Sequence, residues 1–378
     1  MFSPSRLTIA RHRRAWTKSD LAKRAGVSLR SVSAYENGDT EPEADTLARI
    51  AAALGFAVEF FTAPDLDPVE PDSASFRALS TMTAGQRNAA LAAGAIAIEF
   101  AEWLDRRFVL PSTDLPEFPG AEPEGAARAL RQAWALGERP IRNLVHLLEL
   151  HGVRVFSLAE QCREVDAFCI WRKGIPYVFL NTQKSPERSR LDAAHELGHL
   201  VLHRHAHAAC SAEATDHDPD ERVASFQGRQ AEDEANAFAS AFLMPRAALR
   251  ATVPRLPTFD QLVQIKRTWR VSLAALVHRL HSIGTFNDWQ YRNLCIEISR
   301  NGYRTQEPHG LDDRESSQVL AKVFTELKKK GQTRHDVAKA LRIPARELEE
   351  LLFGLTVSAM EGDGEIAPTP PRGHLRLV

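Results

Sequence analysis

The sequence is poor in cysteine, in long apolar runs and in net charge, and each shortage excludes a class of protein. Its 378 residues include four cysteines and no Cys-x-x-Cys pair, too few for a disulfide framework in a chain of this length. We therefore expect buried thiols in a reducing compartment. The sequence contains no run of about 18 apolar residues, so we expect no transmembrane helix. The polar, basic N-terminus lacks the apolar segment of a secretory signal, so we expect a cytoplasmic protein.

The formal net charge of -1 excludes a protein that binds polyanions with its whole surface, but the charge is distributed unevenly. The first 35 residues carry eight basic residues against a single acidic residue, Asp20. Such a local cluster is typical of a nucleic-acid-binding surface. Composition alone is equally compatible with a solvated basic face.

Residues 5 to 62 carry the start and stop signals of four short helices. Thr17 is a good N-cap for the second helix, with Asp20 three residues later in a near capping box. Gly26 ends that helix, and Ser28 caps the third. Two short helices joined by a Gly-Val-Ser turn predict a helix-turn-helix.

Proline-rich segments and a change of hydrophobic period divide the rest of the chain. The acidic stretch from Pro64 to Pro71 predicts a linker, and residues 84 to 108 predict an alanine-rich amphipathic helix. Three β-prone runs follow, at 153–156, 167–171 and 177–180, with Lys173-Gly174 as a hairpin turn between the last two. Further helices are expected at 124–136, 140–151, 187–204, 228–243, 258–267, 272–282, 287–300 and within 314–354. The tail from about Asp363 is expected to be disordered.

The sequence His195-Glu196-Leu197-Gly198-His199 predicts a metal site on a helix. Residues i and i+4 share a helix face, so His195 and His199 can offer two imidazoles to one ion. Glu196 follows the first ligand and is a candidate general base that acts on water. The alternative is an ordinary amphipathic helix with two surface histidines. The apolar residues around His195 and His199 indicate a buried helix instead, where unpaired imidazoles would be costly.

A catalytic zinc site needs a third protein ligand, and Glu232 is the favoured candidate. Glu232 and Asn236 are i and i+4, so Glu232 could bind the metal while Asn236 orients a ligand histidine through a hydrogen bond. Glu234 lies about 200° around the helix from Glu232 and stays open as the alternative ligand. The rivals by composition are His203, His205 and His207, which are more simply explained as a polar stretch after the catalytic helix.

Two imidazoles and one carboxylate suit Zn²⁺, with Mn²⁺ as an alternative. Zinc in such a site lowers the pKa of a water molecule to about 7 and polarises the scissile carbonyl. Glu196 would take the proton from that water and pass it to the leaving amine. The strand that carries Tyr177, Phe179 and Asn181 could pair with an extended peptide substrate, or it could be a plain core strand.

The third helix of the head, from Ser28 to Tyr35, is the candidate DNA-recognition helix. The residues expected to reach base edges are Ser28, Arg30, Ser31 and Ser33. The residues expected to meet phosphates are Arg11, Arg13, Lys18 and Lys23. The alternative is a helical protein-interaction module. A homodimer on paired half-sites is compatible with such a head.

Residues 5 to 62 resemble the Cro/C1-type helix-turn-helix of xenobiotic-response-element-like regulators. The matching run is Thr17-x-x-x-Leu21-Ala22-x-x-Ala25-Gly26-Val27-Ser28, followed by Val32-Ser33-x-Tyr35-Glu36-x-Gly38-x-x-x-Pro42. Lys18 departs from the glutamine that the family often has. Near the C-terminus, Thr333-x-x-Asp336-Val337-Ala338-x-x-Leu341-x-Ile343 is similar to another helix-turn-helix.

Residues 140 to 308 resemble the ImmA/IrrE-like metalloendopeptidases. The matching segments are Pro140-Ile141-x-Asn143-Leu144, Leu180-Asn181, Ala194-His195-Glu196-Leu197-Gly198-His199, Glu232-x-Glu234-Ala235-Asn236-x-Phe238-Ala239, Leu243-Met244-Pro245, Trp269-x-Val271-Ser272 and Tyr303-Arg304-x-x-Glu307-Pro308. The resemblance implies a site-specific protease that cleaves repressor-type regulators, often in response to DNA damage or mobile-element signals. It also supports Glu232 as a ligand, because related zinc peptidases place a ligand glutamate four residues before an Asp or Asn.

We therefore predict an α+β, mostly helical protein. The expected parts are an all-α helix-turn-helix head (1–63), a linker with an amphipathic helix (64–124), a zincin-like metallopeptidase domain with a small β-sheet (125–310) and a helical C-terminal domain with a disordered tail (311–378). The expected function is zinc-dependent cleavage of a partner repressor by a stress-response protein with a head for double-stranded DNA. The alternatives are a transcriptional regulator whose peptidase domain is a sensor or structural module, and an antitoxin-like or phage-defence component.

Overall fold

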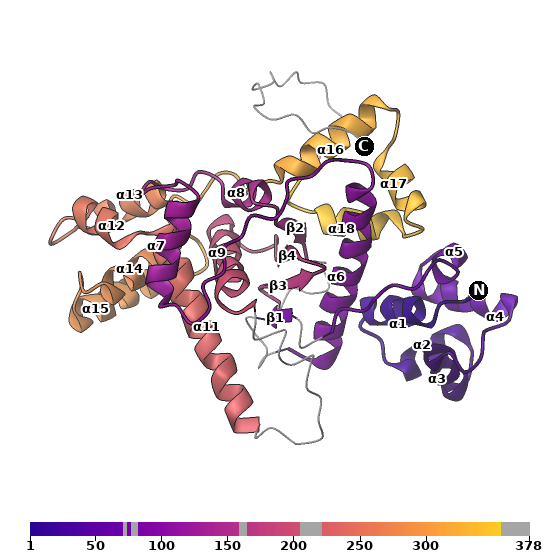
Figure 1. The fold of residues 1–378 in the computed structure, drawn as a ribbon. Helices are drawn as coiled ribbons and strands as arrows, with labels where there is room; N and C mark the ends of the chain where they lie inside the picture. The colour runs from indigo at the N-terminus through magenta and orange to yellow at the C-terminus, as the bar shows by residue number, and fades with distance from the viewer. Residues whose placement is uncertain (71–73, 77–81, 159–164, 205–220, 357–378) are drawn as a thin grey trace. The chain divides into compact units, whose positions relative to one another are not determined.

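The structure, a computed structural model, describes residues 1–70, 74–76, 82–158, 165–204 and 221–356. Across these residues the chain forms 17 helices and four short strands, which confirms the α+β, mostly helical class (Figure 1). None of the described helices combines the length and apolar character that a membrane span requires.

Contacts within the chain divide it into two compact units. Unit 1 comprises Met1–Ser112, Arg154–Asp166 and Ser316–Val378, and unit 2 comprises Thr113–Val153 and Ala167–Glu315. The C-terminal helices, expected as a separate domain, belong to the same unit as the head. Most of the expected peptidase domain, residues 125–310, falls in unit 2.

The head in unit 1 is built from five helices whose ends follow the sequence signals. They are α1 (Pro4–Arg13), α2 (Lys18–Ala25), α3 (Leu29–Asn37), α4 (Ala44–Leu54) and α5 (Val58–Phe61). Thr17 and Asp20 form the predicted capping box, and Gly26 ends α2 with a left-handed φ of 65°. Ser28 caps α3 by accepting a hydrogen bond from the Ser31 amide. The head has a buried apolar core made of Leu7, Leu21, Val32, Ile50 and Leu54.

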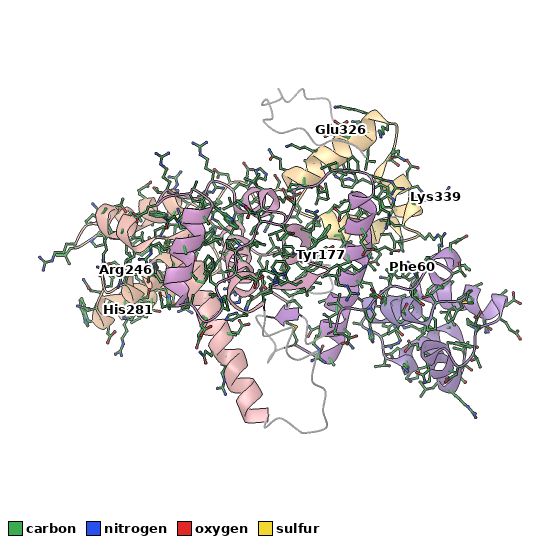
Figure 2. The ribbon with its side chains drawn as sticks, in the orientation of Figure 1. Phe60, Tyr177, Arg246, His281, Glu326 and Lys339 are labelled. Atoms are coloured by element: carbon green, nitrogen blue, oxygen red, sulfur yellow. The ribbon has the colours of Figure 1, made fainter. Side chains whose placement is uncertain are left out.

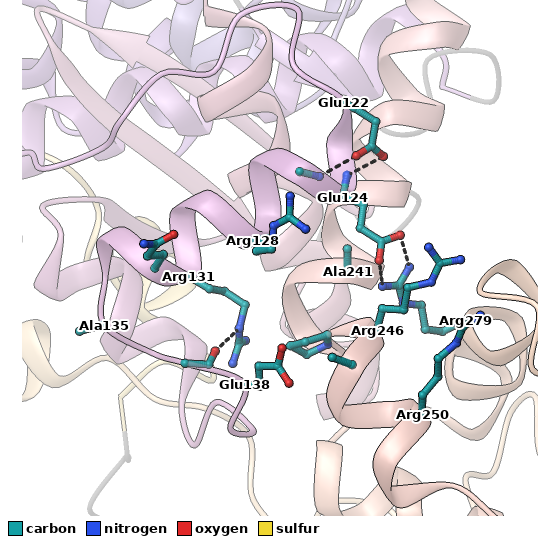
Figure 3. A pocket seen from close by; sticks show the side chains of 15 residues that line it. Glu122, Glu124, Arg128, Arg131, Ala135, Glu138, Ala241, Arg246, Arg250 and Arg279 are labelled. Atoms are coloured by element: carbon teal, nitrogen blue, oxygen red, sulfur yellow. Dashed lines mark hydrogen bonds and ion pairs between the residues drawn. The ribbon is translucent and has the colours of Figure 1, made fainter.

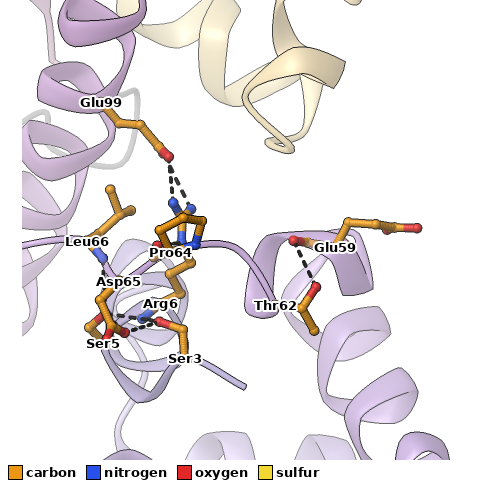
Figure 4. Close-up of polar contacts among 9 residues, drawn as sticks. All are labelled: Ser3, Ser5, Arg6, Glu59, Thr62, Pro64, Asp65, Leu66 and Glu99. Carbon is orange, nitrogen blue, oxygen red and sulfur yellow. Dashed lines mark hydrogen bonds and ion pairs between the residues drawn. The ribbon is translucent and has the colours of Figure 1, made fainter. Parts of the chain in front are cut away.

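The segment after the head, predicted as a linker, is tied to α1 at its start (Figure 4). The Asp65 carboxylate accepts hydrogen bonds from Ser3 and Ser5, which lower its pKa. The buried Arg6 guanidinium donates to the Pro64 carbonyl and to Glu99. Glu99 lies on α6 (Ala84–Asp105), whose alanine-rich surface packs against α1. Unit 1 also contains β1 (Ala74–Phe76), β2 (Arg154–Ser157), α16 (Gln318–Lys329), α17 (Arg334–Ala340) and α18 (Ala345–Leu352).

Unit 2 contains a hairpin and the helices that surround it. They are α7 (Pro123–Ala133), α8 (Leu144–Leu150), β3 (Ala167–Arg172), β4 (Ile175–Leu180), α9 (Pro186–Leu202), α11 (Glu221–Leu243), α12 (Arg246–Thr252), α13 (Phe259–Trp269), α14 (Leu273–Ser282) and α15 (Asp288–Arg300). Helix α9 lies against both strands of the hairpin and packs against α11 and α8. The sheet therefore supports α9 from one side, while α11 contacts it from another.

The β3–β4 hairpin has the predicted two-residue turn. Lys173 and Gly174 have φ values of 49° and 76°, and Arg172 pairs with Ile175 across the turn. Positive φ at both central residues is the type I′ turn that matches the twist of antiparallel strands. In this register Phe168 lies opposite Phe179, and their rings stack 4.4 Å apart between centroids. The stacked rings are buried and form part of the apolar core.

Helix α8 begins later than the sequence predicts. Pro140 was expected in its first turn, but the helix starts at Leu144 with Asn143 as N-cap. The buried Glu315 carboxylate accepts hydrogen bonds from the free amides of Leu144 and Val145. It also pairs with the buried Arg190 of α9. A carboxylate distant in sequence thus accepts from the first amides of the helix. Sequence signals near residue 144 could not predict this partner.

We predict that Glu315→Ala lowers the free energy of unfolding by about 3–5 kcal/mol, because it leaves the buried Arg190 guanidinium without its carboxylate partner. Urea unfolding followed by tryptophan fluorescence measures this loss. Glu297→Ala, at an exposed position of α15, is the matched control and should change stability by less than about 0.5 kcal/mol. Equal stability of the two variants would contradict the structural role of the pair.

Candidate metal centre

Two histidines and a glutamate project from the buried helix α9. Ser185 caps the helix and Pro186 occupies its first turn, a position that tolerates a missing amide. His195, Glu196 and His199 are all buried, with exposed fractions of 0, 0 and 3%. The spacing of four residues places the two imidazoles on one helix face, and their Nε2 atoms lie 3.1 Å apart.

Helix α11 brings a carboxylate to the two imidazoles. The Glu232 oxygens lie 3.2 Å from His195 Nε2 and 3.3 Å from His199 Nε2. Ligand atoms of these three residues all lie within 4.8 Å of one another. The structure thus brings together His195, His199 and Glu232, the three residues that the sequence favoured as ligands.

Gly198 allows α11 to approach α9 this closely. A Cβ atom at this position would lie 3.1 Å from the Phe238 ring and 3.2 Å from the Ala235 Cα. Both contacts are on α11, and the Ala235 contact is with backbone that cannot rotate away. The close approach places Glu232, less than one turn before Ala235, beside the histidines. A side chain at this position would therefore require α11 to move by a few tenths of an ångström.

Hydrogen bonds fix the orientation of both imidazoles. His195 Nδ1 lies 3.1 Å from Asn236 Oδ1. An amide oxygen only accepts, so Nδ1 carries the proton and Nε2 keeps its lone pair. This is the contact expected of Asn236 from its position one turn after Glu232.

A second chain of hydrogen bonds, which sequence analysis did not assign, reaches His199. His199 Nδ1 lies 3.1 Å from His203 Nδ1, and His203 Nε2 lies 2.9 Å from a Glu234 oxygen. Since the carboxylate accepts from His203 Nε2, His203 Nδ1 is left to accept from His199. Glu234 therefore supports His203 and does not share the centre with Glu232. The cues in the sequence were the position of His203 four residues after His199 and the presence of a carboxylate at Glu234.

The charges of the three groups favour a bound cation. Burial lowers the pKa of His199 to about 4, so its imidazole is neutral near pH 7. Burial raises the pKa of Glu232, but its interactions with His195 and His199 outweigh burial and lower that pKa to about 2, so the carboxylate is ionised near pH 7. Two imidazole lone pairs and one carboxylate therefore converge as acceptors. Acceptors converge in this way where a cation joins them, so the residues fit a zinc ion.

Glu196 lies within the same buried helix and contacts the hairpin below. The Cys169 thiol on β3 is buried near this carboxylate, and burial, followed by the negative charge of Glu196, raises the pKa of that thiol well above its usual range. Cys169 was predicted only as a buried thiol, and its burial is confirmed. Its contact with Glu196 depends on the packing of α9 on β3, which spacing in the sequence does not give.

The strand residues considered for substrate contact lie in the core. Tyr177, Phe179 and Asn181 have exposed fractions of 1, 0 and 4%. The Phe179 ring stacks on Phe168, and the Asn181 carbonyl accepts a hydrogen bond from Ser189. Their side chains therefore belong to the core, which does not test the predicted pairing of the strand backbone with a peptide. The rival ligands His205 and His207 lie outside the described residues.

The candidate DNA-contacting residues divide into surface and buried groups. Ser28, Arg30 and Lys23 are exposed, whereas Lys18, Ser31 and Ser33 are half-buried. Arg11 and Arg13 are buried, with exposed fractions of 6 and 1%. The Arg11 guanidinium makes two hydrogen bonds to Glu36, and Arg13 pairs with Glu347 and Glu350. Both arginines are therefore structural ion-pair partners here and not surface groups for phosphate.

Comparison with known families identifies both parts of the chain. Residues 148–281 match the IrrE N-terminal-like domain, a metallopeptidase-type domain, and residues 9–61 match a helix-turn-helix domain. The chain thus joins a helix-turn-helix to a metallopeptidase-type domain. This is the ImmA/IrrE-like architecture, which confirms the resemblance predicted from the sequence. No curated protein matches the chain.

We predict that Gly198→Ala weakens zinc binding by about 10–100-fold, because the added methyl group displaces α11 and with it Glu232 and Asn236. Titration of the metal-free protein with zinc against a competing chelator measures the change. Gly228→Ala on α11 is the control, since its added Cβ would have no neighbour within 4 Å. Unchanged zinc affinity in Gly198→Ala would show that the close helix contact does not set the site.

Proposed function

We propose that this protein is a zinc-dependent endopeptidase that cleaves a partner regulatory protein of the repressor type. The observation that carries the proposal is the convergence of His195, His199 and Glu232 next to Glu196 in a domain of a metallopeptidase family. A structural metal site would not need a carboxylate in the position of a general base. Zinc is chosen over manganese because two imidazoles and one carboxylate suit it best.

In this mechanism His195, His199 and Glu232 hold the ion. A zinc ion bound there supplies an acidified water and an electrophile for the scissile carbonyl. Glu196 takes a proton from the attacking water and delivers it to the leaving amine. Asn236 holds the His195 ring and the Glu234–His203 pair holds the His199 ring, so that both lone pairs would be available to a bound ion.

The presence of a helix-turn-helix head supports the proposal that the substrate is a DNA-bound protein. Ser28 and Arg30 are exposed at the start of α3, where a recognition helix reaches base edges. A protease with such a head would act close to DNA-bound regulators, and a cytoplasmic location and a homodimer on paired half-sites are parts of the same proposal. The resemblance to ImmA/IrrE-like proteins supports a repressor as substrate and a response to DNA damage or other stress.

A second candidate function is DNA-binding regulation without proteolysis, and the exposed start of α3 favours it. In that case the metal centre would act as a sensor or a structural element. The two functions differ in what Glu196 contributes, because DNA binding by the head requires no general base.

We predict that Glu196→Gln abolishes proteolysis while zinc binding stays within about threefold of the wild type, because glutamine cannot take a proton from water. New protein N-termini compared in cells carrying wild type or variant, with and without DNA damage, measure cleavage and name the substrate. Glu297→Gln, on the exposed face of α15, is the control and should behave as wild type. Cleavage products that persist in Glu196→Gln would refute the mechanism, and their absence in every strain would favour the regulator.

A further inference from the structure

The C-terminal helices of unit 1 repeat the local geometry of the head at a constant spacing of 316 residues, as between Thr17 and Thr333. Helices α16, α17 and α18 take the places of α1, α2 and α3. Each threonine caps the second helix and forms a capping box with an aspartate three residues later, Asp20 or Asp336. Two helices of similar length follow in each copy, so the repeat extends beyond a single cap.

Backbone details agree at the same spacing. The turn after the second helix has a left-handed residue in both copies, Gly26 with φ 65° and Arg342 with φ 59°. The next residue donates a 3.0 Å hydrogen bond to the alanine carbonyl five residues earlier in both copies. Gly38 and Gly354, which follow the third helix, have φ values of 77° and 69°. These matches define a second helix-turn-helix in residues 317–356.

The third helix of the second copy carries the wrong charge for DNA. Helix α18 has three glutamates and one arginine in eight residues, with the sequence ARELEELL. The corresponding helix α3 has one arginine and one glutamate. Carboxylates repel DNA phosphates, which dominate the affinity of such heads. The second copy keeps the fold without the electrostatics of a DNA-reading helix.

The same carboxylates bind the basic end of α1. Glu347 is buried and accepts hydrogen bonds from Arg13 and Arg14, at 2.6 and 2.7 Å. Glu350 pairs with Arg13 as well. Glu349, on the same helix, is exposed. The start of α3 stays exposed at Ser28 and Arg30 while α18 holds α1.

We infer that residues 317–356 are a second helix-turn-helix whose third helix has become a docking surface for α1 of the head. Its partner is the head of its own chain, recognised by the Arg13–Arg14 pair. The second copy holds the head in place and does not read DNA, so the chain contacts DNA through one helix-turn-helix.

Hydrogen exchange in the full chain tests the docking. Glu347→Gln combined with Glu350→Gln should speed exchange of α1 amides at least about tenfold, because the buried Arg13 and the half-buried Arg14 lose their charged partners. Glu349→Gln removes the same kind of charge from the exposed face and should leave α1 unchanged. Unchanged exchange in α9 shows that the chain remains folded, and the milder Arg14→Gln should give a smaller change in α1. Full protection of α1 in the double variant would overturn the docking.

A DNA arm tests whether the second copy reads DNA, and it rests on the DNA binding proposed for the head. With random-sequence duplex DNA at low salt, Arg30→Ala should weaken binding, whereas Lys339→Ala on the exposed face of α17 should leave affinity and salt dependence unchanged. A loss in Lys339→Ala equal to that in Arg30→Ala would overturn the inference. The hydrogen-exchange arm stands whether or not the head binds DNA.

A separate feature of unit 2 carries a second inference. A cleft of about 900 Å³ lies among α7, α12, α14 and the end of α11 (Figure 3). Its basic lining residues are all arginines, namely Arg128, Arg131, Arg246, Arg250 and Arg279. Its acidic lining residues are Glu122, Glu124 and Glu138.

Few of these charges cancel. Glu124 pairs with Arg279 at 3.0 Å, and the Glu122 carboxylate accepts hydrogen bonds from backbone amides at the start of α7. Arg131 is buried and donates to the carbonyls of Gly137, Arg139 and Phe242, and the Glu138 carboxylate is close enough to act on its charge. Arg128 is exposed, and its guanidinium has no hydrogen-bond partner among the residues that the structure describes. The cleft is therefore positive and has a buried, fixed guanidinium in its wall.

We propose that this cleft binds a phosphorylated small molecule. Its volume lies within the range of about 300–1,000 Å³ typical of small-molecule sites. Guanidinium groups bind phosphate through paired N–H donors, and the cleft contains arginines without any lysine. Helix α11 lines the cleft through Ala241 and carries Glu232 further toward its start, so both sites share one helix.

Calorimetry on the metal-free protein, with inorganic pyrophosphate and ATP as probes, tests this site without involvement of the metal centre. Wild type should bind at least one probe saturably, and Arg128→Gln combined with Arg250→Gln should weaken that binding at least about tenfold. Arg255→Gln, exposed and outside the cleft, should bind as wild type. No saturable binding of either probe below about 1 mM, or equal binding by all variants, would overturn the proposal.

Discussion

The close contact between α9 and α11 at Gly198 is the constraint on which the metal centre depends. A hydrogen at this position lets the Ala235 backbone approach, and any side chain would meet it within 3.2 Å. The two helices then share their ligands, with two imidazoles from one and a carboxylate from the other. The β3–β4 hairpin packs against α9, and its buried Cys169 thiol lies near Glu196. The packing of α9 on α11 thus brings the three metal-ligating side chains together.

The imidazoles are fixed by different partners that have the same effect. An amide oxygen accepts from His195, whereas a second histidine, supported by a carboxylate, accepts from His199. Each arrangement leaves the Nε2 lone pair toward Glu232. The lowered pKa values of His199 and Glu232 leave a neutral ring beside an ionised carboxylate, which are the protonation states that a divalent cation requires. The site is thereby prepared before any ion binds.

Local patterns predicted what depends on neighbours in sequence. The capping box at Thr17, the turn at Lys173-Gly174 and the i, i+4 histidines each arise within one helix or turn. What the sequence missed depends on distant partners. Arg11 and Arg13 belong to the basic cluster in the sequence, but both are buried in ion pairs with Glu36 and Glu347. The start of α8 depends in the same way on Glu315, which lies 171 residues from Leu144.

X-ray absorption at the zinc edge of the protein loaded with one equivalent of zinc tests the central claim most directly. The account predicts two imidazole nitrogens at about 2.0–2.1 Å and oxygen neighbours, with the imidazole signature reduced by one ring in His199→Ala. A sulfur neighbour at about 2.3 Å would place Cys169 in the site in place of Glu232. That result, or zinc that binds equally well without His195 and His199, would contradict the account.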